Sequence, residues 1–208
     1  MTQQQPPRTL HTVNSVCVFC GSRAGARNDY VAAARALGTE LAQRGLTLIY
    51  GGGHVGLMGE LADAALVANG AVVGVIPEHL MQPEVAHQDL TELIVVESMH
   101  ARKRIMVERA DLFIVLPGGF GSLDELFEVL TWRQLRLHLK PIGLANVAGY
   151  FDALLALLRH ARDEQFIRPE HVDLLLVDAD VARLLARSIA AAAQVPSQRA
   201  PEVTINKA

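Results

Sequence analysis

Strand-like and helix-like patterns alternate along the whole chain, and this alternation constrains the fold more than any other feature. Short apolar runs predict strands at 15–20, 46–50, 71–77, 93–97, 111–116, 141–145 and 172–177. Segments with helical periodicity predict helices at 29–44, 57–69, 99–109, 123–139, 148–163 and 179–194. Such alternation is typical of a mostly parallel sheet with helices on both faces. We therefore expect an α/β, Rossmann-like three-layer domain.

One domain accounts for nearly all of the chain. No linker or internal repeat divides residues 14–194, and 208 residues suit a single core. The apolar residues are mostly Ala, Leu and Val, as expected for a buried parallel sheet. The polar segments 1–13 and 195–208 are expected to be disordered tails.

The charge and hydropathy of the chain argue against several classes of partner. Its formal net charge is −3 and it has no block of Lys and Arg, so we expect neither a nucleic-acid nor a membrane partner. The first residues lack the apolar core of a signal peptide. No apolar run approaches the roughly 20 residues of a transmembrane helix. A cytoplasmic location is the resulting expectation.

Two cysteines, Cys17 and Cys20, are spaced as in a C-x-x-C redox motif. They lie in an apolar run that reads as a strand, where positions three apart point to opposite faces. Two thiols also cannot complete a four-ligand zinc site alone. We interpret them as buried structural thiols and expect no metal site.

The glycine-rich segment 117–122 joins a predicted buried strand to a helix. Its glycines let the backbone approach a ligand closely, and the helix start adds unpaired N–H groups and a positive dipole end. A tight turn with a good cap is the simpler explanation, but three glycines within four residues favour a phosphate site.

A second glycine-rich loop, 51–59, contains a literal G-x-G-x-x-G between a strand and a helix. This pattern raises the possibility of a dinucleotide-dependent oxidoreductase. The loop follows the second strand instead of the first, however, and no clear acid ends the next strand. We interpret Gly52 and Gly53, with Gly21 and Ser22 after the first strand, as ribose or phosphate contacts. The glycine-rich segments 21–25, 51–59 and 117–122 all follow predicted strands, so we expect them to converge on the carboxyl edge of the sheet.

The segment 98–104, SMHARKR, places cations in the first turns of a helix for which Ser98 is the expected N-cap. The helix dipole disfavours cations there, by roughly 0.3–1 kcal/mol for each exposed charge. Removing Arg102 should therefore be neutral or slightly stabilising in the free protein. An anionic ligand nearby would offset the penalty, whereas a solvated basic face is the alternative.

These motifs together resemble the LOG ("Lonely guy") family of cytokinin riboside 5′-monophosphate phosphoribohydrolases, often labelled putative lysine decarboxylases. The resemblance covers about residues 14–190. The matching segments are CVFCGS at 17–22, YGGGHVGLMG at 50–59, GVIPEHL at 74–80, SMHARK at 98–103 and PGGFGSLDELFEVLTW at 117–132.

The resemblance implies a homodimer without a metal or redox cofactor. Its substrate would be a cytokinin riboside 5′-monophosphate, and AMP as well, cut to the free base and ribose 5-phosphate. The catalytic residues would be Arg102 and Glu125. Substrate contacts would come from Glu84, Lys103, Gly118, Gly119, Phe120, Gly121, Ser122, Leu123, Asp124 and Thr131. The family usually has Thr at Ser122 and commonly Glu at Asp124, which puts affinity or base preference in doubt more than activity.

Glu125 has two competing interpretations. A carboxylate can stabilise an oxocarbenium-like sugar or activate water against it. Ser122-x-x-Glu125 is also a capping box, in which Glu125 would only bond the Ser122 N–H. Sequence spacing leaves both open.

Two other activities are weighed against the hydrolase. A non-catalytic nucleotide-binding or carrier protein would share the same motifs. A pyridoxal phosphate decarboxylase needs a Schiff-base lysine, and the chain has only Lys103, Lys140 and Lys207. None of these is a good candidate: the first belongs to the basic motif, the second precedes a proline and the third lies in the tail.

The helix predicted from Leu123 is apolar around most of its surface. Its apolar residues are Leu126, Phe127, Val129, Leu130, Trp132, Leu135 and Leu137. Such a helix must be buried on more than the side that faces the sheet, so at least a homodimer is expected.

Overall fold

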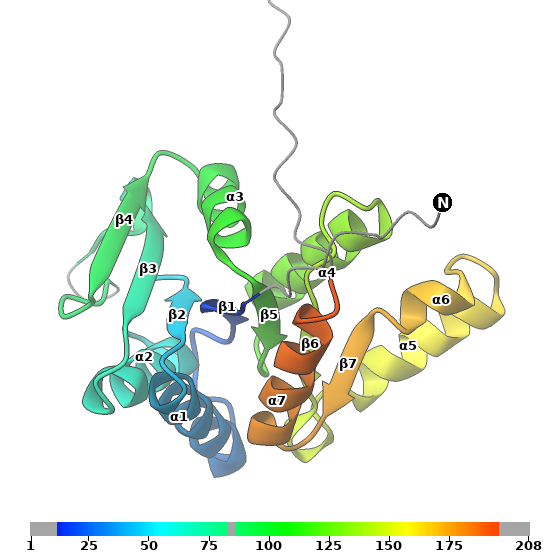
Figure 1. Cartoon of the computed structure of the whole chain (residues 1–208), viewed down its shortest axis with the longest axis horizontal. Helices are drawn as coiled ribbons and strands as arrows, with labels where there is room; N and C mark the ends of the chain where they lie inside the picture. Colours follow the sequence, from blue (N-terminus) through cyan, green and yellow to red (C-terminus); the bar gives the residue numbers. More distant parts are fainter. Residues whose placement is uncertain (1–11, 83–85, 196–208) are drawn as a thin grey trace, which may run out of the picture.

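A computed structural model describes residues 12–82 and 86–195. Seven strands form one sheet in which every pairing is parallel, with the order β4-β3-β2-β1-β5-β6-β7 (Figure 1). Their bounds are Ser15–Phe19 (β1), Thr47–Tyr50 (β2), Val72–Pro77 (β3), Glu92–Val96 (β4), Leu112–Val115 (β5), Ile142–Ala145 (β6) and Leu175–Asp178 (β7). The expected parallel sheet is confirmed. The expected tails fall largely on residues 1–11 and 196–208, which lie outside the described residues.

Helices cover both faces of this sheet and complete three layers (Figure 1). The α-helices are Asn28–Gln43 (α1), Gly56–Val67 (α2), Met99–Arg109 (α3), Phe120–Gln134 (α4), Asp152–Asp163 (α5), Pro169–Val172 (α6) and Val181–Ala192 (α7). Short 3-10 turns, η1 and η2, span Glu78–Leu80 and Val147–Gly149. On one face of the sheet, α1, α2 and α7 contribute to one buried hydrophobic cluster. On the other face, α3 and α4 contribute to a second cluster, against which partly buried residues of α5 also pack.

Two predicted elements differ from the structure. The helix predicted at 123–139 is α4, which starts at Phe120 and ends at Gln134, because the preceding glycines allow the turn to close earlier. Arg136 follows with a positive φ of 60°, which ends the helix. The strand predicted at 172–177 is divided between α6, which begins at Pro169, and β7. Proline suits the first turn of a helix, where its missing N–H costs nothing.

The order of strands positions the ligand-binding edge. The chain first runs from β1 outward to β4 and then returns to the other side of β1 with β5. In such doubly wound sheets, ligands bind outside the carboxyl ends of the strands where the order reverses. The segments after β1, β2 and β5 therefore meet at one edge, as predicted. The N–H of Gly21 donates to the carbonyl of Pro117 at 3.0 Å, and the N–H of Leu57 donates to that of Gly21 at 3.0 Å.

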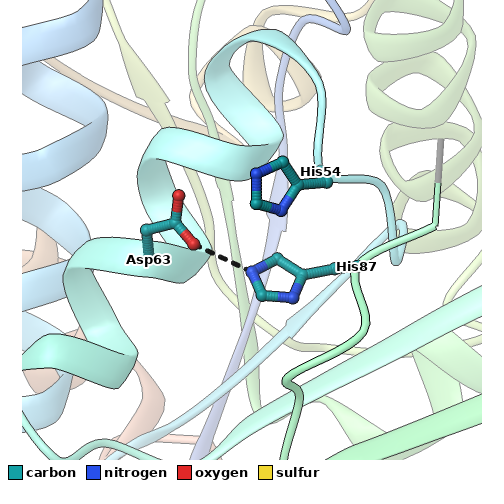
Figure 2. A group of neighbouring side chains, drawn as sticks. All are labelled: His54, Asp63 and His87. Carbon is teal, nitrogen blue, oxygen red and sulfur yellow. Dashed lines mark hydrogen bonds and ion pairs between the residues drawn. The ribbon is translucent and has the colours of Figure 1, made fainter. Parts of the chain in front are cut away.

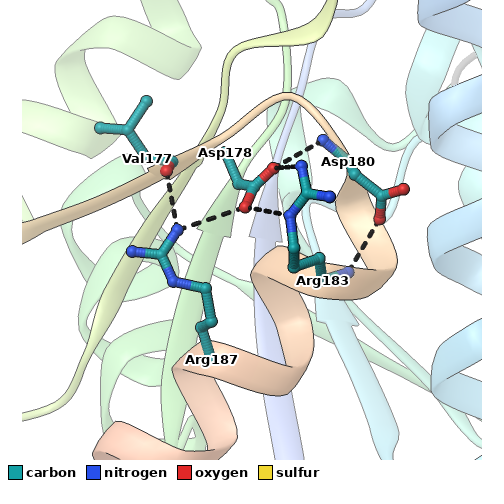
Figure 3. A network of polar contacts seen from close by, with 5 residues as sticks. All are labelled: Val177, Asp178, Asp180, Arg183 and Arg187. Carbon is teal, nitrogen blue, oxygen red and sulfur yellow. Dashed lines mark hydrogen bonds and ion pairs between the residues drawn. The ribbon is translucent and has the colours of Figure 1, made fainter.

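A polar network surrounds Asp178, the last residue of the outermost strand β7 (Figure 3). Its carboxylate accepts hydrogen bonds from Arg183, Arg187 and the N–H of Asp180. The bonds from Arg183 are the main reason that the pKa of Asp178 lies well below its usual value. Asp180 caps α7 by accepting the N–H of Arg183 at 2.8 Å. The network thus fixes α7 to the edge strand.

Among the described helices, none combines the length and apolar character needed to cross a membrane.

Candidate active site

A pocket of about 240 Å³ opens at the carboxyl edge of the sheet, between the β2 side and the start of α4. Its polar groups include a cation, a carboxylate and the first turn of a helix, while its other wall is apolar. The lining residues are Cys20, Ser22, Gly51, Gly53, Met58, Ile76, Leu80, Arg102, Gly119, Phe120, Gly121, Ser122 and Glu125. The three glycine-rich or small-residue loops predicted to converge therefore share one pocket.

Arg102 and Glu125 form an ion pair at the floor of this pocket. Nη1 of Arg102 lies 3.1 Å from Oε1 of Glu125, and the two side chains are only 13% and 9% exposed. Arg102 comes from α3 and Glu125 from α4, the helices on either side of β5 in the chain. The pair predicted to be catalytic is therefore brought together by the fold.

The guanidinium of Arg102 is held from three further sides. Its Nε donates to the carbonyl of Val75 at 3.0 Å, and Nη1 contacts the sulfur of Met99 at 3.2 Å. Nη2 passes so close to the backbone of Gly51 that a Cβ at that position would overlap with it. The absence of a side chain at Gly51 is thus a condition for the observed position of Arg102.

Burial controls the charge of Glu125. Desolvation raises the pKa of its carboxyl above the ordinary glutamate value, and the positive charge of Arg102 opposes this rise. A carboxyl group with a raised pKa is suited to exchanging protons with a substrate or water. The site thus holds a potential acid–base group beside a fixed cation.

The first turn of α4 presents unpaired backbone donors to the same pocket. Gly119 is its N-cap residue, and no side chain caps it. The N–H groups of Phe120, Gly121 and Ser122 lie in the first turn, where helices have no internal partner for them. With the positive end of the helix dipole, these donors suit an anion such as a phosphate.

The capping-box interpretation of Glu125 is wrong. Ser122 lies inside α4, three residues after the N-cap Gly119, so it does not cap the helix. Glu125 is one turn further along and its carboxylate is paired with Arg102. A Cβ at Gly118 would overlap with the Ser122 side chain, so the loop packs tightly against the helix start.

A second, larger pocket of about 540 Å³ adjoins the first and shares Ser22, Gly119 and Phe120 with it. Tyr30 and Tyr150 form part of its wall, with their rings edge-to-face at 5.6 Å. Phe120 is 94% exposed where the two pockets meet. The pocket of Arg102 and Glu125 therefore opens onto a wider space that could hold the remainder of a ligand.

Other residues predicted to contact substrate lie away from the Arg102 pocket. Lys103 pairs with Asp124 and Glu128, each at 3.1 Å, and lines neither pocket. Leu123 packs against the core of the α3 and α4 face. Thr131 lines a separate groove of about 160 Å³.

One predicted contact that follows β2, Gly52, also differs in position. Gly52 does not line the pocket. It has a positive φ of 75° and faces Ile76 and Leu93, behind the wall. Glu84 lies outside the described residues.

The acids that offset the cations of α3 come from within the protein. The sequence suggested a bound anion, but Glu125 pairs with Arg102 while Asp124 and Glu128 pair with Lys103. Removing Arg102 would leave the buried Glu125 without its partner, which is destabilising. The expectation that this change is neutral is therefore corrected.

Sequence reasoning also missed the apolar wall of the pocket. Met58, Ile76 and Leu80 line it, although their sequence patterns indicate only a helix, a strand and an irregular segment. They lie within the matching segments 50–59 and 74–80, but no local pattern indicates that they share a pocket wall, because their common position depends on the packing of three elements.

The two cysteines are structural, as expected. Cys17 belongs to the buried cluster on one face of the sheet and Cys20 to the cluster on the other. Burial is the main cause of the raised pKa of each thiol. A redox or nucleophilic cysteine needs a lowered pKa instead. Cys20 also lines the pocket of Arg102 and Glu125, which the sequence did not indicate.

The dinucleotide interpretation of Gly51 to Gly56 fits the structure poorly. The N–H of Leu57, at the start of α2, already donates to the carbonyl of Gly21. A Cβ at Gly56 would overlap with the backbone of Ser22 and Arg23. This loop packs against its neighbour and leaves no open cradle for a pyrophosphate.

The two candidate lysines of a decarboxylase are also engaged elsewhere. Lys103 is held between two acids, and Nζ of Lys140 donates to the carbonyl of Val107 at 2.6 Å. Lys207 lies outside the described residues.

A pocket at the switch point of a doubly wound parallel sheet places this protein among the Rossmann-like α/β proteins. The chain matches the family model described as "Possible lysine decarboxylase" over residues 58–188. It is 49% identical over 170 residues to a probable cytokinin riboside 5′-monophosphate phosphoribohydrolase of Oryza sativa subsp. japonica, covering 82% of this chain and 75% of the rice protein. It is 46% identical over 176 residues to the cytokinin riboside 5′-monophosphate phosphoribohydrolase LOG1 of Arabidopsis thaliana, covering 84% and 81%. The chain belongs to the LOG family.

Solved structures share the fold at lower identity. The molybdenum cofactor carrier protein of Chlamydomonas reinhardtii is similar with a TM-score of 0.65 and 22% identity, covering 86% of this chain and 99% of that one. The molybdenum cofactor binding protein of Rippkaea orientalis has a TM-score of 0.64 at the same identity, covering 88% and 99%. These likenesses concern the fold alone, so function must be argued from the site.

The contact between Gly51 and Arg102 can be tested by Gly51→Ala. The added methyl group should push the guanidinium away from Glu125, costing about 1–3 kcal/mol of unfolding free energy, as overpacking does. In the Arg102→Ala background the same change should cost less than about 0.5 kcal/mol, because the overlapping group is gone. Denaturant unfolding of the four proteins measures this coupling. Equal costs in both backgrounds would show that Gly51 is not needed for Arg102.

Proposed function

We propose that the protein is a nucleoside 5′-monophosphate phosphoribohydrolase that acts on cytokinin riboside 5′-monophosphates and on AMP. The single observation that carries the proposal is the buried Arg102–Glu125 pair beside the open first turn of α4. The relatives named for this activity, which match over most of the chain, support the same substrate class.

The open helix start is the proposed phosphate site. The 5′-phosphate would accept hydrogen bonds from the N–H groups of Phe120, Gly121 and Ser122. The Ser122 side chain, which is 4% exposed and lines the pocket, is placed to add a hydroxyl donor. The dipole of α4 adds to the attraction, because its positive end faces the pocket.

The reaction breaks the bond between C1′ of ribose and a ring nitrogen of the base. The bonding electron pair leaves with the base, which is then protonated, and positive charge builds on the sugar. Water supplies its oxygen to C1′. Glu125 would stabilise the developing oxocarbenium ion and accept the proton of the water. The positive charge of Arg102 favours the ionised form of Glu125, and its guanidinium would orient the ribose or phosphate.

A non-catalytic nucleotide carrier is the second candidate, and the fold of the carrier proteins is compatible with it. The raised pKa of Glu125 favours the enzyme. A buried carboxylate beside an anion-binding site would repel a phosphorylated ligand, so a pure carrier has no use for it.

The proposed phosphate site predicts a strong preference for nucleotides over nucleosides. AMP and its N6-isopentenyl analogue should release free base, with kcat/KM at least about tenfold above that of the matching nucleosides. Chromatography of the free base after incubation with each compound measures this preference. Equal turnover of adenosine and AMP would contradict the phosphate site, and tight AMP binding without any base would favour the carrier.

Glu125→Gln tests the proposed catalytic carboxylate. The amide keeps the shape but cannot accept the proton of water, so turnover should fall by roughly 10²-fold or more while AMP still binds. The melting temperature should fall, because the buried guanidinium of Arg102 loses its charged partner, so turnover and AMP binding are compared at a temperature at which the variant is folded. Glu128→Gln is the matched control, because Glu128 lies on the same helix but outside the pocket.

The wild-type enzyme provides a second readout of the same carboxylate. The active form is ionised, so kcat/KM should fall as the pH decreases through the pKa of Glu125 in the free enzyme. Because burial raises this pKa, the loss should begin at a higher pH than for an ordinary glutamate. Retained activity in Glu125→Gln would place the catalytic group elsewhere.

We also propose that the protein is a homodimer whose interface includes the outer side of α4. Phe127 is 39% exposed, and Leu135 and Leu137 just beyond the helix are 61% and 66% exposed. Phe127 and Thr131 line the 160 Å³ groove between α4, α5, α6 and β7. An exposed apolar patch of this kind is typical of an interaction surface. If Thr131 contacts substrate, it would do so in the pocket of a second copy.

Light scattering at micromolar concentration should give twice the chain mass of 22.5 kDa. Phe127→Asp should shift the protein toward the monomer, because it buries a charge in the interface. Val67→Asp is the control, since Val67 is 84% exposed at the end of α2 on the opposite face of the sheet. A monomeric wild-type protein would contradict the dimer.

A further inference from the structure

Three metal-ligating side chains lie together beside the catalytic pocket without lining it (Figure 2). His54 precedes α2, Asp63 lies on α2, and His87 lies in the segment before β4. One potential ligand atom from each lies within 4.8 Å of the other two. The reaction proposed above uses none of them.

We propose that His54, Asp63 and His87 bind a divalent transition-metal ion, with Zn²⁺ as the best match. Two imidazole nitrogens favour zinc and its neighbours over magnesium or calcium, which prefer oxygen ligands. Three protein ligands leave the fourth tetrahedral position for water. This ligand set revises the expectation that the chain has no metal site.

The backbone around His87 is already fixed in the position that the site requires. Its N–H donates to the carbonyl of Gly52 at 3.0 Å, and the preceding Ala86 pairs with Gly53 in an antiparallel bridge. The side chain is 2% exposed. A site held by packed surroundings loses less entropy when it binds its ligand.

The distance between His87 and Asp63 needs only a small adjustment, whereas the ring of His54 has to turn toward the ion. Nε2 of His87 lies 2.9 Å from Oδ1 of Asp63. Two ligand atoms of a tetrahedral zinc ion lie about 3.3 Å apart, given bonds of about 2.0–2.1 Å. The imidazole rings of His54 and His87 have centroids 4.6 Å apart. His54 is exposed, so its ring can rotate toward the ion at little cost.

Zinc binding requires the proton on the His87 ring to move from one ring nitrogen to the other. Its Nδ1 accepts the N–H of Asp89 at 3.2 Å, so Nε2 carries the proton that is shared with Asp63. Zinc takes the place of that proton on Nε2, and the neutral ring carries its proton on Nδ1 instead. The contact with the exposed Asp89 is then given up.

The ion would join the segment before β4 to α2 and to the loop after β2. That loop supplies Gly51 and Gly53 to the wall of the catalytic pocket. Zinc should therefore stabilise the wall and raise the melting temperature without taking part in glycosidic cleavage. The metal proposal and the proposed function can fail independently, because AMP hydrolysis is assayed separately with metal-free protein.

The test uses the full chain without a histidine tag, freed of metal by a chelator. Competition between the protein and a chromophoric chelator for Zn²⁺ should show one site per wild-type chain, and Zn²⁺ should raise its melting temperature. His54→Ala should bind at least about tenfold more weakly, since even outer-shell changes cost 10–100-fold. This variant should fold normally because His54 is exposed. Asp63→Asn should weaken binding too.

His160→Ala is the matched control, because His160 is an exposed histidine on α5. It should bind zinc as the wild type does. If wild type and His54→Ala bind Zn²⁺ equally, or neither is stabilised by it, the proposal is wrong. The trio would then be a hydrogen-bonded His87–Asp63 pair with the His54 ring resting against it.

Discussion

The ion pair between Arg102 and Glu125 is the constraint on which the candidate site depends. It joins α3 to α4 across β5, and both partners are almost completely buried. A buried pair of this kind rarely stabilises a protein more than apolar residues of the same size would, whereas removing one partner leaves an uncompensated charge. Its surroundings are arranged around it: Val75 bonds the guanidinium and Gly51 leaves room for it. Such an arrangement is better explained by a role in a reaction than by a contribution to the stability of the fold.

The sheet explains why the pair lies where a ligand can reach it. With β1 between β2 and β5, the loops after these three strands meet at one edge. The bonds from Gly21 to Pro117 and from Leu57 to Gly21 tie the loops to each other, so their backbone is rigid before any ligand binds. Preorganised donors of this kind lose little free energy to reorganisation during a reaction.

The sequence predicted the parallel sheet and the convergence of the loops because both follow from local patterns. It could not predict the partners of the cations, since Arg102 and Glu125 are 23 positions apart and meet only through tertiary packing. Local spacing was misleading at Ser122, whose capping-box pattern is real as a sequence but lies one turn too far into the helix. The position of Thr131, away from Arg102, likewise depends on the direction of one helix face.

The start of α4 is one of five described α-helix starts without a side-chain cap, together with those of α1, α2, α5 and α6, and it is distinguished by donors that face the pocket. Ser98 caps α3 and Asp180 caps α7, so side-chain oxygens satisfy backbone donors at both. At α4 the N-cap is Gly119, which has no side chain to offer, and the donors of the first turn face the pocket. If a side chain of the protein accepted hydrogen bonds from these donors, the site would lose its attraction for a phosphate. The missing cap therefore costs helix stability that a bound anion can restore, so nucleotide binding should stabilise α4 more than the rest of the fold.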